Sequence, residues 1–143
     1  MNQRRVLLGA LVLALSACSQ MEMKKEASLY DRLGGKPAVT AVVDDFIGNV
    51  AGDGRINGRF ANANIPRLKQ MLGDQICAAA GGPCTYTGRD MMSAHRGMNI
   101  NDAEFGALVG DLVKSLDKFR VPEREKGELL GALGGMKPQI VGH

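Results

Sequence analysis

The chain has no tryptophan, and aromatic residues make up only 4% of its sequence. Proteins that bind nucleic acid usually combine a basic stripe with aromatic side chains on which bases stack. Such a stripe is missing here, because 18 lysines and arginines are scattered among 15 acidic residues. We therefore expect no nucleic-acid partner. A hydrophobic share of 45% indicates an ordinary globular protein, and 143 residues accommodate a single domain.

Residues that ligate metals or assist nucleophiles are equally scarce. The sequence holds two histidines, His95 and His143, and three cysteines. Covalent c-type haem is excluded because no Cys-x-x-Cys-His occurs, and the spacing of Cys77, Cys84 and His95 is not that of a zinc site. No nucleophile motif points to a Ser-His-Asp triad. Judged by residue type alone, a histidine such as His95 is more often structural or exposed than a metal ligand.

The sequence also lacks the alternating pattern of a β-strand and any internal repeat. From residue 28 onward, apolar residues instead recur every three or four positions, as on the buried face of a helix. Four such stripes occur, at 37–50, 64–76, 101–119 and 122–140, after a short first helix that ends at a glycine pair. These patterns predict an all-α fold with four principal helices and glycine-rich corners.

No apolar run is long enough to span a bilayer as a stable anchor, although residues 6–15 form a short one behind Arg4 and Arg5. This run leads into Leu-Ser-Ala-Cys, which resembles the lipobox of bacterial lipoproteins. In that class the thiol of the cysteine, here Cys18, takes a diacylglycerol, and the preceding peptide, here residues 1–17, is removed. The alternative is an ordinary secretory signal that leaves Cys18 as a spare thiol.

The lipoprotein interpretation places the protein in the cell envelope. Residues 18–27 would tether a periplasm-facing domain at 28–143 to the membrane. The outer membrane is favoured, because Ser19 rather than Asp follows the lipidated cysteine. Removal of the signal, which carries two arginines and no acids, leaves 16 basic and 15 acidic residues. Electrostatic steering of partners is therefore not expected to be a central feature.

The oxidising periplasm also bears on the two remaining cysteines, Cys77 and Cys84. They flank Ala-Ala-Ala-Gly-Gly-Pro, which can turn the chain back on itself. In the chain-entropy picture, a disulfide between them would stabilise the fold by about 2–3 kcal/mol. The alternative is that both are small buried residues that never bond. We expect the disulfide.

Several segments of the domain resemble the group I truncated haemoglobins. They are LYDRLGG at 29–35, VVDDF at 42–46, GGP at 81–83 and YTGRDM at 86–91, and the last runs on to His95. The resemblance covers nearly the whole of the expected domain. It implies a two-over-two helical sandwich around haem b, with His95 as the proximal ligand to the iron.

The resemblance also implies which side chains surround the haem. Phe60 falls where the family packs an aromatic ring on the haem face, and the alternative for it is plain core packing. Lys69 and Arg96 are candidate partners of the haem propionates, although charged surface residues often only face solvent. The implied cofactor-binding set is completed by Phe46, Ile47, Leu68, Leu72 and Met91.

The distal side of this site departs from the family pattern. Ile47 stands where the family often has a tyrosine, and Leu72 where it often has a glutamine. Such donors stabilise bound oxygen through a hydrogen bond worth roughly 1.5–3 kcal/mol, so their loss predicts oxygen retention weaker by about an order of magnitude. Binding of neutral CO and NO should suffer less. Gln70 and Gln75 are not expected to replace these donors, because helical phase favours neither.

The resemblance thus implies reversible binding of O2, NO or CO. It also allows an enzymatic activity, the dioxygenation of NO to nitrate, which would need an unidentified reductase as partner. Two alternatives stand beside it. One is a lipoprotein that has lost haem and uses its helices as an interaction module. The other is an electron-transfer haem protein in which a methionine is the second axial ligand, with Met71 as the nearest candidate in sequence.

Overall fold

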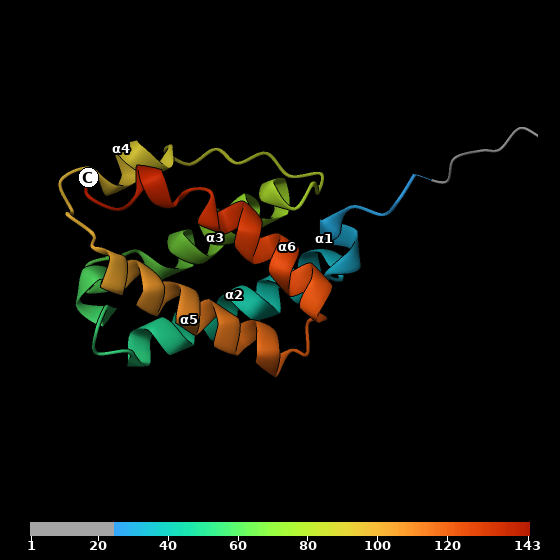
Figure 1. Cartoon of the computed structure of the whole chain (residues 1–143), viewed down its shortest axis with the longest axis horizontal. Helices are drawn as coiled ribbons and strands as arrows, with labels where there is room; N and C mark the ends of the chain where they lie inside the picture. The colour runs from blue at the N-terminus through green and yellow to red at the C-terminus, as the bar shows by residue number, and fades with distance from the viewer. Residues whose placement is uncertain (1–24) are drawn as a thin grey trace, which may run out of the picture.

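The computed structural model describes residues 25–143 (Figure 1). This part of the chain is helical, as predicted, and its one strand-like feature is an isolated bridge between Ile100 and Val141. The expected signal, its cleavage site and Cys18 lie outside the described residues. Within the described part, no helix has both the length and the apolar character needed to cross a membrane.

Six α-helices and two short 3-10 turns follow one another along the described chain. The four long helices correspond to the four predicted apolar stripes. In chain order the elements are α1 (Leu29–Arg32), α2 (Gly35–Gly52), η1 (Asn57–Phe60), α3 (Ile65–Ala79), α4 (Met91–His95), α5 (Asp102–Lys118), α6 (Glu123–Gly134) and η2 (Lys137–Gln139).

Capping side chains explain where three of these helices begin. The hydroxyl of Ser28 accepts a hydrogen bond from the backbone N–H of Asp31, and the Asn64 side chain caps α3 in the same way. At α5, Asn101 and Glu104 form a complete capping box, in which each side chain accepts from the backbone N–H of the other. These contacts satisfy N–H groups that the first turn of a helix leaves without partners.

Helix α2 is the centre of the packing and contacts both α3 and α5. Helix α6 closes the fold against α3 and α1, and Figure 1 shows α5 and α6 lying across α2 and α3. The most deeply buried side chains include Val50 of α2, Leu116 of α5 and Leu129 of α6, each 2% exposed or less. Burial of such large apolar groups is the main favourable contribution to folding in a small domain.

The C-terminal segment differs from the single helix predicted at 122–140. Helix α6 ends at Gly134, because a glycine pair weakens the helix there and Pro138 has no N–H to donate. The chain then folds back on the loop that follows α4. The N–H of Asn99 donates to the carbonyl oxygen of His143 at 2.6 Å, beside the isolated bridge.

Candidate functional site

Helix α4, only five residues long, is the element that positions His95. It begins where the carboxylate of Asp90 accepts a hydrogen bond from the backbone N–H of Ser93 at 2.9 Å. Hydrogen bonds from Ser93 hold the pKa of Asp90 below its usual value. A carboxyl group with a lowered pKa stabilises the folded state at neutral pH, and this contribution is lost as the pH falls through that pKa.

The imidazole of His95 is held in one tautomer. Its Nδ1 lies 2.8 Å from the carbonyl oxygen of Met91, one turn earlier in α4. Because a carbonyl can only accept, Nδ1 carries a proton, and in the neutral ring the lone pair is then on Nε2. This is the arrangement of an iron-ligating histidine, whose second ring nitrogen is fixed by a hydrogen bond.

His95 is half-buried and lines an apolar cavity, which we call the histidine cavity. Arg59 also lies there: its guanidinium pairs with Glu104 at 2.7 Å and donates to the carbonyl oxygen of Met98 at 2.8 Å. The other walls are apolar side chains from η1 and the residue before it, the loop after α4, α5 and the C-terminal segment, namely Ile56, Phe60, Met98, Ile100, Phe105, Leu108 and Ile140. The cavity therefore combines a nitrogen lone pair, apolar walls and one paired cation.

The two candidate partners of the haem propionates, Lys69 and Arg96, lie outside the lining of the histidine cavity. Lys69 lines another cleft and pairs with Asp44 at 2.9 Å, and Arg96 is exposed and does not line the histidine cavity. Arg59 borders that cavity instead, and its place directly before Phe60 is the sequence signal that could have revealed it. Arg59 is therefore a further candidate partner of a haem propionate, beside Lys69 and Arg96.

Two neighbouring apolar cavities share walls with the histidine cavity. The first, which we call the inner cavity, shares three residues with it and contains three of the predicted site residues, Phe46, Leu72 and Met91. The second shares Phe60 and contains two more, Ile47 and Leu68. Predicted site residues from α2, α3 and α4 thus converge on one apolar region of the fold.

The other polar or sulfur-containing side chains predicted on α3 have different places. Gln70 lines the outer cleft that also holds Lys69, in agreement with its expected phase. Gln75, by contrast, lines the inner cavity, because it lies three residues after Leu72 and so shares its helical face. Met71 lines neither the inner cavity nor the histidine cavity, which does not favour it as a second axial ligand.

The chemistry of this region suits a flat apolar cofactor that carries its own metal ligands. The walls are apolar, and His95 presents a free nitrogen lone pair. Within residues 25–143, no group of three or more His, Cys, Asp or Glu side chains could hold a metal ion. An iron here would therefore need the further nitrogen ligands that a porphyrin supplies. The residues present fit a haem held by His95.

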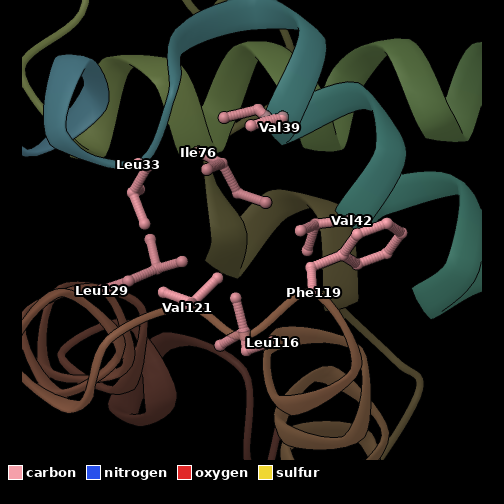
Figure 2. Close-up of a pocket in the computed structure, with 9 residues that line it drawn as sticks. Leu33, Val39, Val42, Ile76, Leu116, Phe119, Val121 and Leu129 are labelled. Atoms are coloured by element: carbon pink, nitrogen blue, oxygen red, sulfur yellow. The ribbon is translucent and has the colours of Figure 1, made fainter.

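A further apolar cavity lies behind Ile76 (Figure 2). Its walls come from α1 and α2 on one side and from the α5–α6 corner on the other, namely Leu33, Ala38, Val39, Val42, Leu116, Phe119, Val121 and Leu129. Phe119, which the sequence pattern places on a buried stripe, is 43% exposed. Ile76 also lines the inner cavity, so this one side chain borders both spaces.

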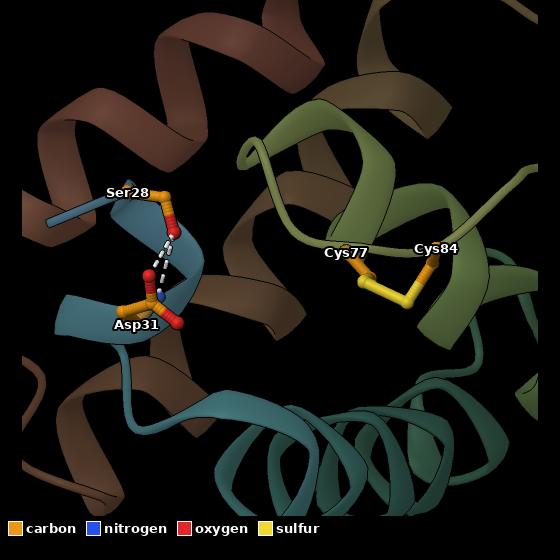
Figure 3. The surroundings of a disulfide bond; sticks show 4 residues. All are labelled: Ser28, Asp31, Cys77 and Cys84. Atoms are coloured by element: carbon orange, nitrogen blue, oxygen red, sulfur yellow. Dashed lines mark hydrogen bonds between the residues drawn. A yellow bond between two sulfur atoms is a disulfide. The ribbon is translucent and has the colours of Figure 1, made fainter.

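A disulfide ties the end of α3 to the loop that leads to α4 (Figure 3). It joins Cys77, which is buried, to Cys84, with a Cα–Cα distance of 5.8 Å. Gly82 lies inside the closed loop, where an added Cβ would be 2.6 Å from the Tyr30 ring and 2.7 Å from the Cys77 sulfur. The N–H of Tyr30 donates to the carbonyl oxygen of Ala80 at 2.9 Å. The start of the loop before α4 is therefore closely packed against α1.

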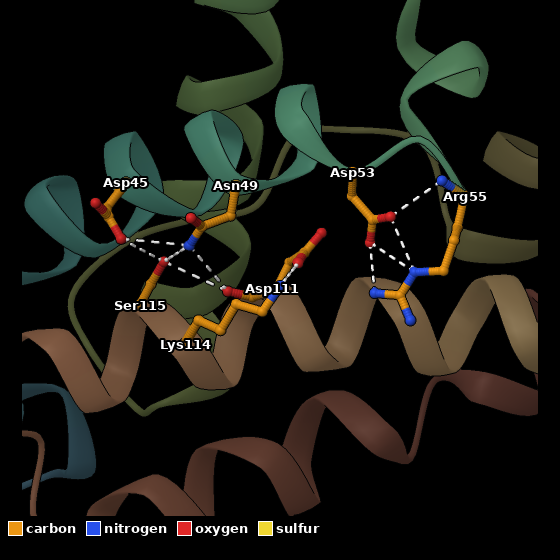
Figure 4. Close-up of polar contacts among 7 residues, drawn as sticks. All are labelled: Asp45, Asn49, Asp53, Arg55, Asp111, Lys114 and Ser115. Atoms are coloured by element: carbon orange, nitrogen blue, oxygen red, sulfur yellow. Dashed lines mark hydrogen bonds and ion pairs between the residues drawn. The ribbon is translucent and has the colours of Figure 1, made fainter.

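Figure 4 shows a polar network that joins α2 to α5. The amide of Asn49 donates to the Ser115 hydroxyl at 2.9 Å, which in turn donates to Asp45 at 2.8 Å. The carboxylate of Asp111 is fully buried; one oxygen pairs with Lys114 at 2.8 Å, and the other has no hydrogen-bond partner. None of these residues lines the histidine or inner cavity, so the network holds the two helices together without contributing to the haem region.

Comparison with known proteins places this geometry in a family. A model of the bacterial-like globin family matches residues 28–141. A group 1 truncated haemoglobin of Mycolicibacterium paratuberculosis is 39% identical over 114 residues, which are 80% of this chain and 84% of that protein. The Fe(III) truncated haemoglobin of Tetrahymena pyriformis superposes with a TM-score of 0.79 at 27% identity, covering 82% of this chain and 100% of that one. The 2/2 haemoglobin of a Synechococcus species, solved in the cyanomet state with covalently attached haem, gives a TM-score of 0.77 at 31% identity and the same coverage.

These matches confirm the two-over-two helical sandwich and the haem cofactor that the sequence resemblance implied. The individual side-chain contacts to haem stay predictions. The family match, over residues 28–141, includes the four long helices and His95. The chain therefore belongs to the bacterial-like globin family and is a truncated globin.

Proposed function

We propose that the protein is a lipid-anchored haem globin that binds diatomic gases at the periplasmic side of the cell envelope. As a truncated globin it binds haem iron and gaseous ligands such as oxygen. The observation that carries the assignment of the site is the free Nε2 of His95 beside an apolar cavity. When bound, haem supplies the iron at which a gas binds reversibly.

The chain's own residues prepare this site in two ways. The hydrogen bond to Met91 orients the His95 ring, so that Nε2 needs no reorganisation to ligate iron. The apolar side chains of the histidine and inner cavities exclude water, which disfavours ions and favours small neutral ligands such as O2, NO and CO. Ile76 borders both the inner cavity and the cavity behind it, so apolar space lies on two sides of this side chain.

The proposal includes a specific activity, the removal of NO by its conversion to nitrate. Ile47 and Leu72 offer no hydrogen bond to a bound gas, which penalises neutral NO less than oxygen. Bound haem would supply the one electron that conversion of NO and O2 to nitrate consumes in each cycle. Continued turnover would therefore require a reductase as partner.

Spectroscopy of the domain with haem tests the gas-binding function directly. We expect the haem-free domain, residues 28–143, to take up one equivalent of haem and to show a Soret band that shifts when CO is added to the ferrous form. The measurement is an absorbance titration with haem, followed by ferric, ferrous and CO spectra. A domain that is folded and helical by circular dichroism yet takes up no haem would contradict the proposal and favour the interaction-module alternative.

The lipid anchor is supported by the tetrapeptide that ends at Cys18 and by the short tether behind it. Ten residues, 18–27, reach at most about 35 Å when fully extended. Because the tether joins the domain at α1, we propose that the α1 end of the domain lies nearest the bilayer.

Replacing Cys18 with serine should release the protein from the membrane. Expressed as the full chain in a bacterial host, the wild-type protein is expected in the membrane fraction and to incorporate labelled fatty acid. The Cys18→Ser variant should incorporate none, whereas the Cys84→Ser variant should incorporate label as the wild type does, because Cys84 lies in the folded domain and not in the lipobox. Labelling that survives in Cys18→Ser would contradict the anchor.

A further inference from the structure

Gln75 occupies an unexpected place among the apolar residues of the fold. It is half-buried on α3 and lines the inner cavity together with Phe46, Leu72 and Met91. Among the described residues that line this cavity, it is the only one whose side chain carries an N–H or O–H group. The inner cavity therefore contains a single side-chain hydrogen-bond donor.

The contacts of the Gln75 amide are weak. Its Nε2 lies 3.2 Å from the sulfur of Met91 and 3.4 Å from the sulfur of Met136. A thioether sulfur is a poor acceptor, so these contacts repay little of the cost of placing an amide among apolar side chains. The N–H groups of Gln75 are thus free to turn to a better acceptor that enters the cavity, at small cost to the protein.

The position of this amide along the helix links it to the iron ligand. Gln75 contacts the side chain of Met91, and the backbone carbonyl of Met91 orients the His95 ring. Leu72, one turn before Gln75 on the same face of α3, stands at the distal position where the family often has a glutamine. The side chain of a helical residue leans toward the preceding turn, so the amide of Gln75 is directed toward the Leu72 position.

We infer that Gln75 donates the hydrogen bond to the bound gas that Ile47 and Leu72 cannot give. The inference rests on the proposed haem site. Bound oxygen carries partial negative charge and is a better acceptor for this amide than the thioether sulfurs of Met91 and Met136, whereas bound CO is a much weaker one. Gln75 is then a specificity-determining residue that favours oxygen over CO. It reverses the weak oxygen retention that the apolar residues at positions 47 and 72 predict.

The test compares two glutamines of the same helix. In the haem-loaded protein, Gln75→Leu should raise the oxygen dissociation rate by about 10-fold and leave the CO dissociation rate within about two-fold, because a hydrogen bond to oxygen is lost. The C–O stretching frequency of the ferrous CO form, read by infrared spectroscopy, should rise when the donor is removed. Gln70→Leu, whose side chain lies in the outer cleft, is the matched control and should change none of these values.

The outcomes separate the inference from the function on which it rests. If the wild-type protein binds haem and CO but Gln75→Leu leaves oxygen dissociation and the C–O frequency unchanged, Gln75 is only a packing residue and the inference is overturned. A variant that changes O2 and CO dissociation by the same factor also overturns it, because altered packing affects both gases. Failure of the wild-type protein to bind haem would instead overturn the proposed function and the inference with it.

Discussion

Replacement of His95 by alanine is expected to weaken haem binding by more than about 100-fold, since loss of an outer-shell partner of a metal-ligating histidine alone costs about 10–100-fold. The variant retains the apolar walls of the histidine cavity, including Phe60 and Phe105, so weak residual binding of haem should persist. Its ferrous CO spectrum should differ from that of the wild type because the axial nitrogen is missing. Absorbance titration of the haem-free domain with haem measures both effects.

The other histidine of the chain provides the matched control. The Nε2 of His143 lies 3.0 Å from the carbonyl oxygen of Pro138, so this ring has a structural contact but no place in the proposed site. His143→Ala should bind haem as the wild type does. Imidazole added to His95→Ala should restore a wild-type-like spectrum in part, because it can occupy the space of the missing ring. Equal haem affinity in His95→Ala and the wild type would refute the proximal assignment.

Removal of the disulfide is expected to lower the free energy of unfolding by about 2.5 kcal/mol, the chain-entropy value for the short loop that Cys77 and Cys84 close. For a domain of this size, that corresponds to a fall in melting temperature of about 10 °C. Alanine is the suitable replacement at both positions, because Cys77 is buried and a hydroxyl group there would lack a partner. Urea and thermal unfolding of Cys77→Ala/Cys84→Ala measure the effect.

A chemical reductant separates the stabilising effect of the disulfide bond from that of the packing of the two cysteine side chains. Wild-type protein in excess dithiothreitol should unfold at nearly the same urea concentration as the double variant, and the reductant should not change the double variant. If the reductant leaves the wild-type protein unaffected while the double variant is destabilised, the cysteines contribute by packing alone. The loss should also raise the mobility of the loop before α4, since the bond ties that loop to α3.

The helices could be predicted from the sequence because their signals are local. The apolar stripes recur within each helix, and Asn101 with Glu104 marks the start of α5 within four residues. The end of α6 could not be predicted in this way. The apolar pattern continues through Met136 and Ile140, yet the helix stops at Gly134, and both residues reach the inner cavity from irregular backbone.

The sequence could propose an iron ligand because the chain has only two histidines and a family motif leads to one of them, His95. The polar lining of the site could not be proposed in this way. Gln75 contacts Met91 and Met136, which are 16 and 61 residues away in sequence. No periodicity within α3 reveals which other segments complete a cavity wall. The same reason explains why sequence periodicity does not reveal that Arg59 borders the histidine cavity.

The last residues of the chain are a fixed part of the domain, not a free end for attachment. The N–H of Asn99 bonds to the His143 carbonyl at 2.6 Å and that of Gly142 to the Ile100 carbonyl at 2.9 Å, directly after the helix that bears His95. A polyhistidine tag fused behind residue 143 would therefore place foreign imidazoles next to the segment that follows His95. A cleavable tag in front of residue 28 keeps them away from this segment, so the spectra would report His95 and not the tag.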